Sequence, residues 1–179
     1  MRTGYSHEKI AVLAENAAFL VLALALSFVE SLIPFNLLIP VPGAKLGLAN
    51  LAVLLAVHRS GFLSGASVSL TRVVLASFLF GSVSSLAFSL SGACLSLVLL
   101  LVLRPLYGRG CSWIGISVAC AAAHNFGQIL TAAVWMHESA VLLYLPVLLL
   151  TAVLFGTITG MLANLVSAHL PARGKRSTL

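Results

Sequence analysis

Polar side chains inside apolar segments are the residues of this sequence best suited to bind a ligand. Arg72 lies in one such segment, and His124, Asn125 and Gln128 lie in another. A charged side chain at the centre of a membrane helix costs about 2.5–3.5 kcal/mol on insertion scales, so it usually faces a cavity or a charged partner. Two roles therefore stay open: a shared ligand pocket, or structural bonding, with Glu30 pairing Arg72 and the amides joining helices.

The run PGAKLGLAN, residues 42–50, adds a second group of candidate ligands. Its glycines allow close approach of the backbone, and the helix that follows presents unpaired N–H groups beside the positive charge of Lys45. These features suit an anion, although a lysine at a membrane surface can also serve as a snorkelling anchor. We predict an outward-facing pocket for an anionic small molecule. Its candidate residues are Lys45, Asn50, Arg72, His124, Asn125 and Gln128, with Glu30 balancing the charge.

The acidic residues argue against several kinds of chemistry. The chain has four Asp and Glu residues in total, all of them glutamate, and no two lie within one helical turn. Magnesium-dependent prenyl or phosphoryl transfer uses clustered carboxylates. The three cysteines lack metal-ligand spacing, and no Walker A motif is present. The sequence therefore predicts no catalytic constellation, no metal site and no cofactor.

Composition indicates that lipid is the solvent of these segments. Hydrophobic residues make up 60% of the chain and charged residues only 8%, against about 25% charged in a typical soluble domain. The net charge of +6 does not indicate nucleic acid, because most lysines and arginines flank apolar segments and act as topology signals. A multi-pass protein of a cytoplasmic membrane is the resulting prediction.

Six transmembrane helices in one domain, residues 1–179, fit the apolar pattern. The expected fold is an all-α integral membrane bundle. Five helices, with the second segment re-entrant, are the alternative, because that segment is too short to cross a hydrocarbon core of about 30 Å. The expected helices cover about 10–33, 46–57, 61–80, 86–103, 113–135 and 141–168.

The charges orient this bundle. With the N-terminus in the cytoplasm and six spans, the outer side receives Lys45 alone. This asymmetry satisfies the positive-inside rule and places both termini in the cytoplasm. The cytoplasmic cations are Arg2, Lys9, Arg59, Arg104, Arg109, Arg173, Lys175 and Arg176.

The runs PGAKLGLAN and AHNFGQ, within a chain of this length, resemble the bacterial family called heptaprenyl diphosphate synthase component I, also labelled Gx transporter. The six-helix outline is similar to the substrate-binding S components of energy-coupling-factor vitamin transporters. That second resemblance implies that Ala14 and Ala18 dock a coupling subunit, as an Ala-x-x-x-Ala motif does in S components. It also implies that the first outer loop helps to close the pocket.

Two functions follow from these resemblances. One is binding or uptake of a vitamin, a flavin or an isoprenoid precursor, powered by partner ATPases. The other is a noncatalytic membrane subunit of polyprenyl diphosphate or quinone biosynthesis, partnered with a prenyl synthase. The absence of aspartate in the sequence excludes the usual aspartate-rich catalytic motif of that synthase. A packing subunit without a ligand is a third possibility.

Overall fold

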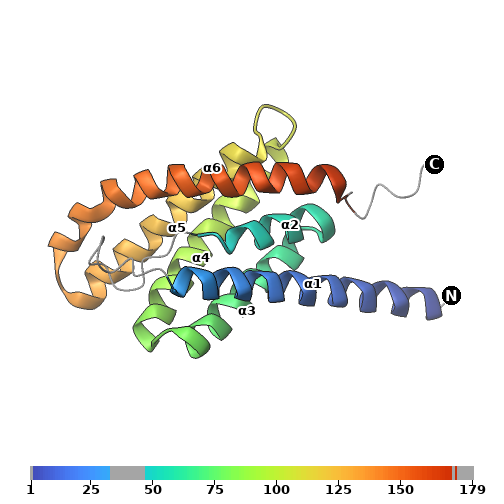
Figure 1. Ribbon diagram of the computed structural model, residues 1–179, viewed down its shortest axis with the longest axis horizontal. Helices are drawn as coiled ribbons and strands as arrows, with labels where there is room; N and C mark the ends of the chain where they lie inside the picture. The colour runs from blue at the N-terminus through green and yellow to red at the C-terminus, as the bar shows by residue number, and fades with distance from the viewer. Residues whose placement is uncertain (1, 33–46, 171, 173–179) are drawn as a thin grey trace.

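The computed structural model describes residues 2–32, 47–170 and 172, and this part of the chain is an all-helical bundle (Figure 1). The first helix begins at Arg2 rather than near Ile10, because the polar residues that precede the apolar segment continue the helix without interruption. Helices α1 to α6 span Arg2–Ser31, Asn50–Ser60, Phe62–Phe80, Val83–Leu103, Trp113–Met136 and Leu145–His169, with short 3₁₀ turns at Arg104–Leu106 (η2) and Ser139–Tyr144 (η3).

The bundle is that of a membrane protein. Within the described residues, four helical segments are long and apolar enough to cross a bilayer: His7–Ser31, Phe62–Phe80, Val83–Leu106 and Ser139–His169. Large apolar side chains such as Leu63, Phe78 and Leu143 point outward, where only lipid could cover them. The predicted all-α membrane fold is therefore confirmed.

Helix α2 occupies the centre of this bundle. Its 11 residues extend only about 16 Å, roughly half of a hydrocarbon core. Residues 52–57 are all buried, so α2 is covered on every side. It contacts α1, α3, α5 and α6. This arrangement makes α2 a core helix that ends at Ser60, just beyond His58 and Arg59, and it begins at Asn50 instead of near residue 46.

Contacts along α1 give the direction of α2. The Leu48 N–H, just before α2, donates to Glu30 near the end of α1. Arg59, near the end of α2, pairs with Glu15 of α1. Helix α2 therefore runs antiparallel to α1 and returns the chain toward the side on which α1 begins.

Both ends of the described chain lie at one end of the bundle (Figure 1). The imidazole of His58 lies 3.0 Å from the carbonyl oxygen of Leu170, which brings the end of α6 to the end of α2. We call this region, which includes His58, Arg59 and Arg104, the basic end. This is the end that the sequence analysis predicts to face the cytoplasm.

Glycines let α5 and α6 pack closely. A Cβ added at Gly156 would lie 2.7 Å from the Cα of Val118, and one at Gly160 would lie 2.5 Å from the Cα of Ile114. Any larger residue at these positions would force the two backbones apart. Gly65 plays the same role against Val57, between α3 and α2. The small-residue spacing of the sequence thus serves packing inside the bundle.

Candidate functional site

Arg72 is the charged residue at the heart of the predicted pocket, and it lies between α3 and α1. Only 3% of its surface is exposed, and its Nη1 atom lies 3.5 Å from the hydroxyl oxygen of Ser27. Glu30, 4% exposed, attracts the guanidinium electrostatically. Within the described residues, Nε and Nη2 of Arg72 have no hydrogen-bond partner. Arg72 is thus a buried cation whose charge is balanced by Glu30 on the neighbouring helix.

Glu30 also fixes the start of α2. Its Oε1 atom accepts a hydrogen bond of 2.6 Å from the backbone N–H of Leu48. A carboxylate at this position complements the positive end of the α2 dipole. The carboxylate of Glu30 therefore already accepts one of the N–H groups that the sequence analysis assigned to an anionic ligand. Lys45, the other cation of that prediction, lies outside the described residues.

The polar residues of α5 divide between two helix interfaces. Asn125 donates from Nδ2 to the Leu148 carbonyl of α6 at 2.7 Å, a bond that joins the two helices. His124 and Gln128 lie against α4 instead. A Cβ at Gly92 would lie 2.7 Å from the His124 carbonyl oxygen and 3.0 Å from Gln128 Cγ. The glycine at residue 92 is thus what makes room for these two larger side chains.

Asn50 lines a small internal cavity of about 10 Å³ between α2, α3, α4 and α5. Ser69, Ser117 and Cys120 contribute further polar atoms to its wall. A cavity of this size holds about one water molecule. It lies one helical turn from Arg72 through Ser69, and one turn from His124 through Cys120.

The described structure therefore places the predicted site residues in separate groups. Arg72 and Glu30 meet beside α1, Asn125 bonds to α6, and His124 and Gln128 lie against α4. Helix α3 packs against α1, α2 and α4, whereas α5 packs against α2, α4 and α6. Binding of a small molecule by these residues stays a prediction.

Ala14 and Ala18 lie exposed on one face of α1. Between them in sequence, Glu15 points toward the bundle and binds both Arg59, at 2.9 Å, and the hydroxyl of Ser60, at 3.0 Å. This ion pair fastens the N-terminal part of α1 to the end of α2. The two alanines are consequently presented on a helix that is anchored by its other face.

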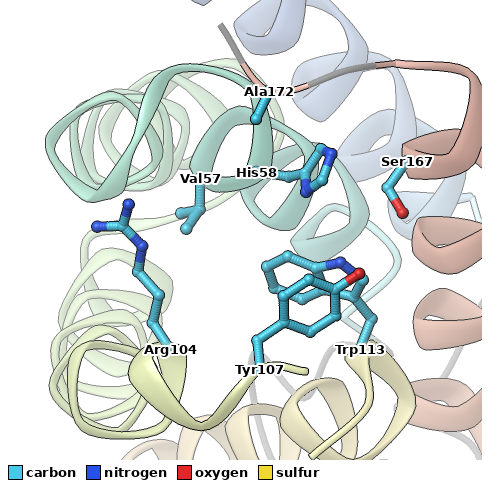
Figure 2. A pocket seen from close by; sticks show the side chains of 7 residues that line it. All are labelled: Val57, His58, Arg104, Tyr107, Trp113, Ser167 and Ala172. Carbon is cyan, nitrogen blue, oxygen red and sulfur yellow. The ribbon is translucent and has the colours of Figure 1, made fainter. Parts of the chain in front are cut away.

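A larger hollow, with a volume of about 390 Å³, opens at the basic end (Figure 2). The rings of Tyr107 and Trp113 are stacked with their centroids 4.4 Å apart, and the His58 ring meets Trp113 edge-on at 5.8 Å. Arg104 extends along the opposite wall of the hollow. The hollow is lined by Val57, His58, Arg104, Tyr107, Trp113, Ser167 and Ala172.

The sequence did not indicate this pocket. In the sequence, Trp113 has the position of an interfacial anchor, and Arg104 counts among the cytoplasmic cations that orient the bundle. One signal in the sequence could have indicated it. The end of α2, the end of α4 and the start of α5 are expected on the same side of the membrane, and each carries a basic or aromatic residue. Those residues could have been expected to gather there.

A protein-family model, described as heptaprenyl diphosphate synthase component I, matches residues 19–166. The match covers every described helix except the first part of α1 and the last residues of α6. No curated protein and no solved structure matches the chain. The chain belongs to the heptaprenyl diphosphate synthase component I family.

Proposed function

We propose that this protein is a noncatalytic membrane subunit that acts through a partner protein docked on α1. The observation that carries the proposal is the exposed small-residue face formed by Ala14 and Ala18. Only 11% of the residues in the most apolar part of α1 are buried, although α1 is the longest helix of the described bundle. Small side chains allow a second helix to approach closely in lipid. Among the described helices, α1 packs mainly against α2 and α3, which leaves such a face available.

We propose that the partner is the catalytic subunit of a polyprenyl diphosphate synthase. The family description names one component of such an enzyme, which implies that others supply the rest. The aspartate-free sequence supports a noncatalytic role, because prenyl elongation of the usual kind needs clustered carboxylates to hold magnesium. The subunit would hold the synthase at the membrane, where its product must enter the bilayer.

Uptake of a small molecule is the second candidate function. It is favoured by the spacing of Ala14 and Ala18, which matches the docking motif that S components use. In this case the partner is a membrane coupling subunit with ATPases, and the ligand is anionic. Lys45, Asn50 and Arg72 are then expected to contribute to its binding.

The test is to replace both alanines by leucine and to measure polyprenyl diphosphate synthesis and its product chain length in isolated membranes. We expect Ala14→Leu/Ala18→Leu to release the synthase from the membrane and to alter the product chain length, as deletion of the protein does. Ala168→Leu is the matched control, because this alanine is also exposed but lies on α6. Unchanged synthesis in the double variant and in the deletion strain would exclude the prenyl function, and loss of uptake of an anionic nutrient in both would favour the second candidate.

A further inference from the structure

The described residues that line the hollow at the basic end include several hydrogen-bond donors and no carboxylate. Arginine and the indole nitrogen can only donate, and the tyrosine hydroxyl can donate as well. A site with donors and no acidic residue suits a group rich in acceptors, such as a phosphate. Its volume of about 390 Å³ falls within the range of roughly 300–1,000 Å³ that small-molecule sites occupy.

Trp113 forms a buried part of the wall of this hollow. Its side chain is 2% exposed, and within the described residues its Nε1 atom has no hydrogen-bond partner. A buried N–H group without an acceptor is unfavourable, so native structures normally provide one. Because the Nε1 atom itself is buried, a ligand in the hollow would meet the indole ring of Trp113 rather than its N–H group.

Arg104 supplies the charge. The other arginine beside it at the basic end, Arg59, is held by Glu15 at 2.9 Å. Arg104 is exposed, and no ion pair or side-chain hydrogen bond engages it within the described part of the chain. Its Nη2 atom lies near Gly61, where an added Cβ would be 3.9 Å away, so the guanidinium stands beside the turn between α2 and α3. From there it faces the hollow (Figure 2).

The remaining wall suits the apolar part of an amphiphile. The stacked rings of Tyr107 and Trp113 present flat apolar faces, and Val57 adds an aliphatic side chain. Aromatic residues of this kind concentrate at the level of the lipid head groups. His58 acts as a positioning residue, because its bond to the Leu170 carbonyl holds the end of α6 over the site.

We infer that this pocket binds the phosphate group of a membrane amphiphile, with Arg104 on the phosphate oxygens and the rings of Tyr107 and Trp113 against the apolar part. The phosphate can belong to a phospholipid head group or to a prenyl diphosphate, since both combine the same anion with an apolar chain. The inference does not depend on the partner proposed for α1. The ligand is expected to bind to the isolated subunit, without any partner protein.

The fluorescence of Trp113 can also report ligand binding in the hollow. The chain has two tryptophans, and Trp135 is 55% exposed at the far end of α5. In a Trp135→Phe background, Trp113 fluorescence can be followed in the detergent-purified full chain. The probes are farnesyl diphosphate, phosphatidic acid, inorganic pyrophosphate and the neutral alcohol farnesol.

We expect a saturable change with farnesyl diphosphate or phosphatidic acid and none with farnesol. Arg104→Gln should weaken the affinity at least about tenfold. Arg109→Gln is the matched control, because Arg109 lies in the same exposed loop without lining the hollow, and it should leave the affinity within about twofold. Circular dichroism of both variants verifies that they fold.

The pattern of binding identifies the source of the phosphate. Preference for phosphatidic acid indicates a membrane lipid, and preference for farnesyl diphosphate indicates a prenyl substrate or product. No response to any phosphate-bearing probe would overturn the inference, and so would an equal loss in the Arg104 and Arg109 variants. Because no partner protein is present, this result is independent of the test of Ala14 and Ala18.

Discussion

Replacing Glu30 by glutamine tests whether Arg72 depends on a partner inside the bundle. The amide oxygen of the glutamine can still accept the Leu48 N–H, which Glu30 binds at 2.6 Å. What the substitution removes is the negative charge facing a guanidinium that is only 3% exposed. The variant therefore isolates the electrostatic role of Glu30 from its role at the start of α2.

The expected loss of stability is large. Glu30 attracts Arg72 electrostatically, and a buried charge that loses its compensating charge costs about 3–5 kcal/mol. Within the described residues, the hydrogen bond from Arg72 to the Ser27 hydroxyl is long, at 3.5 Å, and compensates little of this charge. We therefore expect Glu30→Gln to lower the free energy of unfolding by about 3 kcal/mol. Arg72→Met should cost less, because the carboxylate keeps the Leu48 N–H as a donor.

Equilibrium unfolding in mixed micelles, driven by increasing dodecyl sulfate, measures these values. The double variant Glu30→Gln/Arg72→Met should lose less than the sum of the single variants, with a coupling of about 2 kcal/mol. Glu138→Gln is the control, since Glu138 is exposed and bonds only its local backbone. Stability of Glu30→Gln within about 0.5 kcal/mol of the unaltered protein would refute the reasoning.

Three further predictions concern packing and the bonds between helices. Gly160→Val should destabilise the protein by about 2–3 kcal/mol, because its Cβ would meet the Ile114 backbone at 2.5 Å. Gly115→Ala, whose Cβ meets nothing closer than 4.0 Å, should be nearly neutral in the same unfolding assay. Asn125→Leu should cost about 1 kcal/mol by removing the bond to Leu148, and an unchanged stability would show that the bond contributes nothing. Glu15→Gln should cost about 1 kcal/mol and increase amide exchange in the first half of α1, and this effect should disappear in an Arg59→Met background.

Sequence periodicity and charge predicted much of the fold. The lengths of the apolar runs predicted the helical segments. A glycine directly follows the last residue of α2 (Gly61) and of α3 (Gly81), and such glycines mark helix ends. The pairs Gly61/Gly65 and Gly156/Gly160 have the small-residue spacing that favours close helix packing, and Gly65, Gly156 and Gly160 make such contacts. The placement of both described ends on one side also agrees with the asymmetry of lysine and arginine.

The central position of α2 could not be predicted in the same way. A helix that is apolar on all sides can face either lipid or protein, and hydropathy does not distinguish these environments. Its burial follows from its neighbours α1, α3, α5 and α6, which pack around it. The two alternatives of the sequence analysis, a sixth span or a re-entrant segment, left that question open.

The candidate sites show the same limit. The sequence identified Arg72, His124 and Asn125 as unusual, but spacing within a helix does not tell which neighbour each side chain meets. The partners Leu148 for Asn125 and Ser27 for Arg72 are distant in sequence and become visible only in the fold. The hollow at the basic end likewise combines residues from α2, η2, α5 and α6.

Cross-linking from α1 in living cells tests the central claim most directly. A genetically encoded photoreactive residue at Ala18, on the exposed face of α1, is compared with the same residue at Val153, which is 50% exposed on α6. We predict a covalent adduct between position 18 and a catalytic polyprenyl diphosphate synthase subunit, with none from position 153. Absence of a protein adduct at position 18, or equal labelling from both positions, would contradict the account of this chain as a subunit docked through α1.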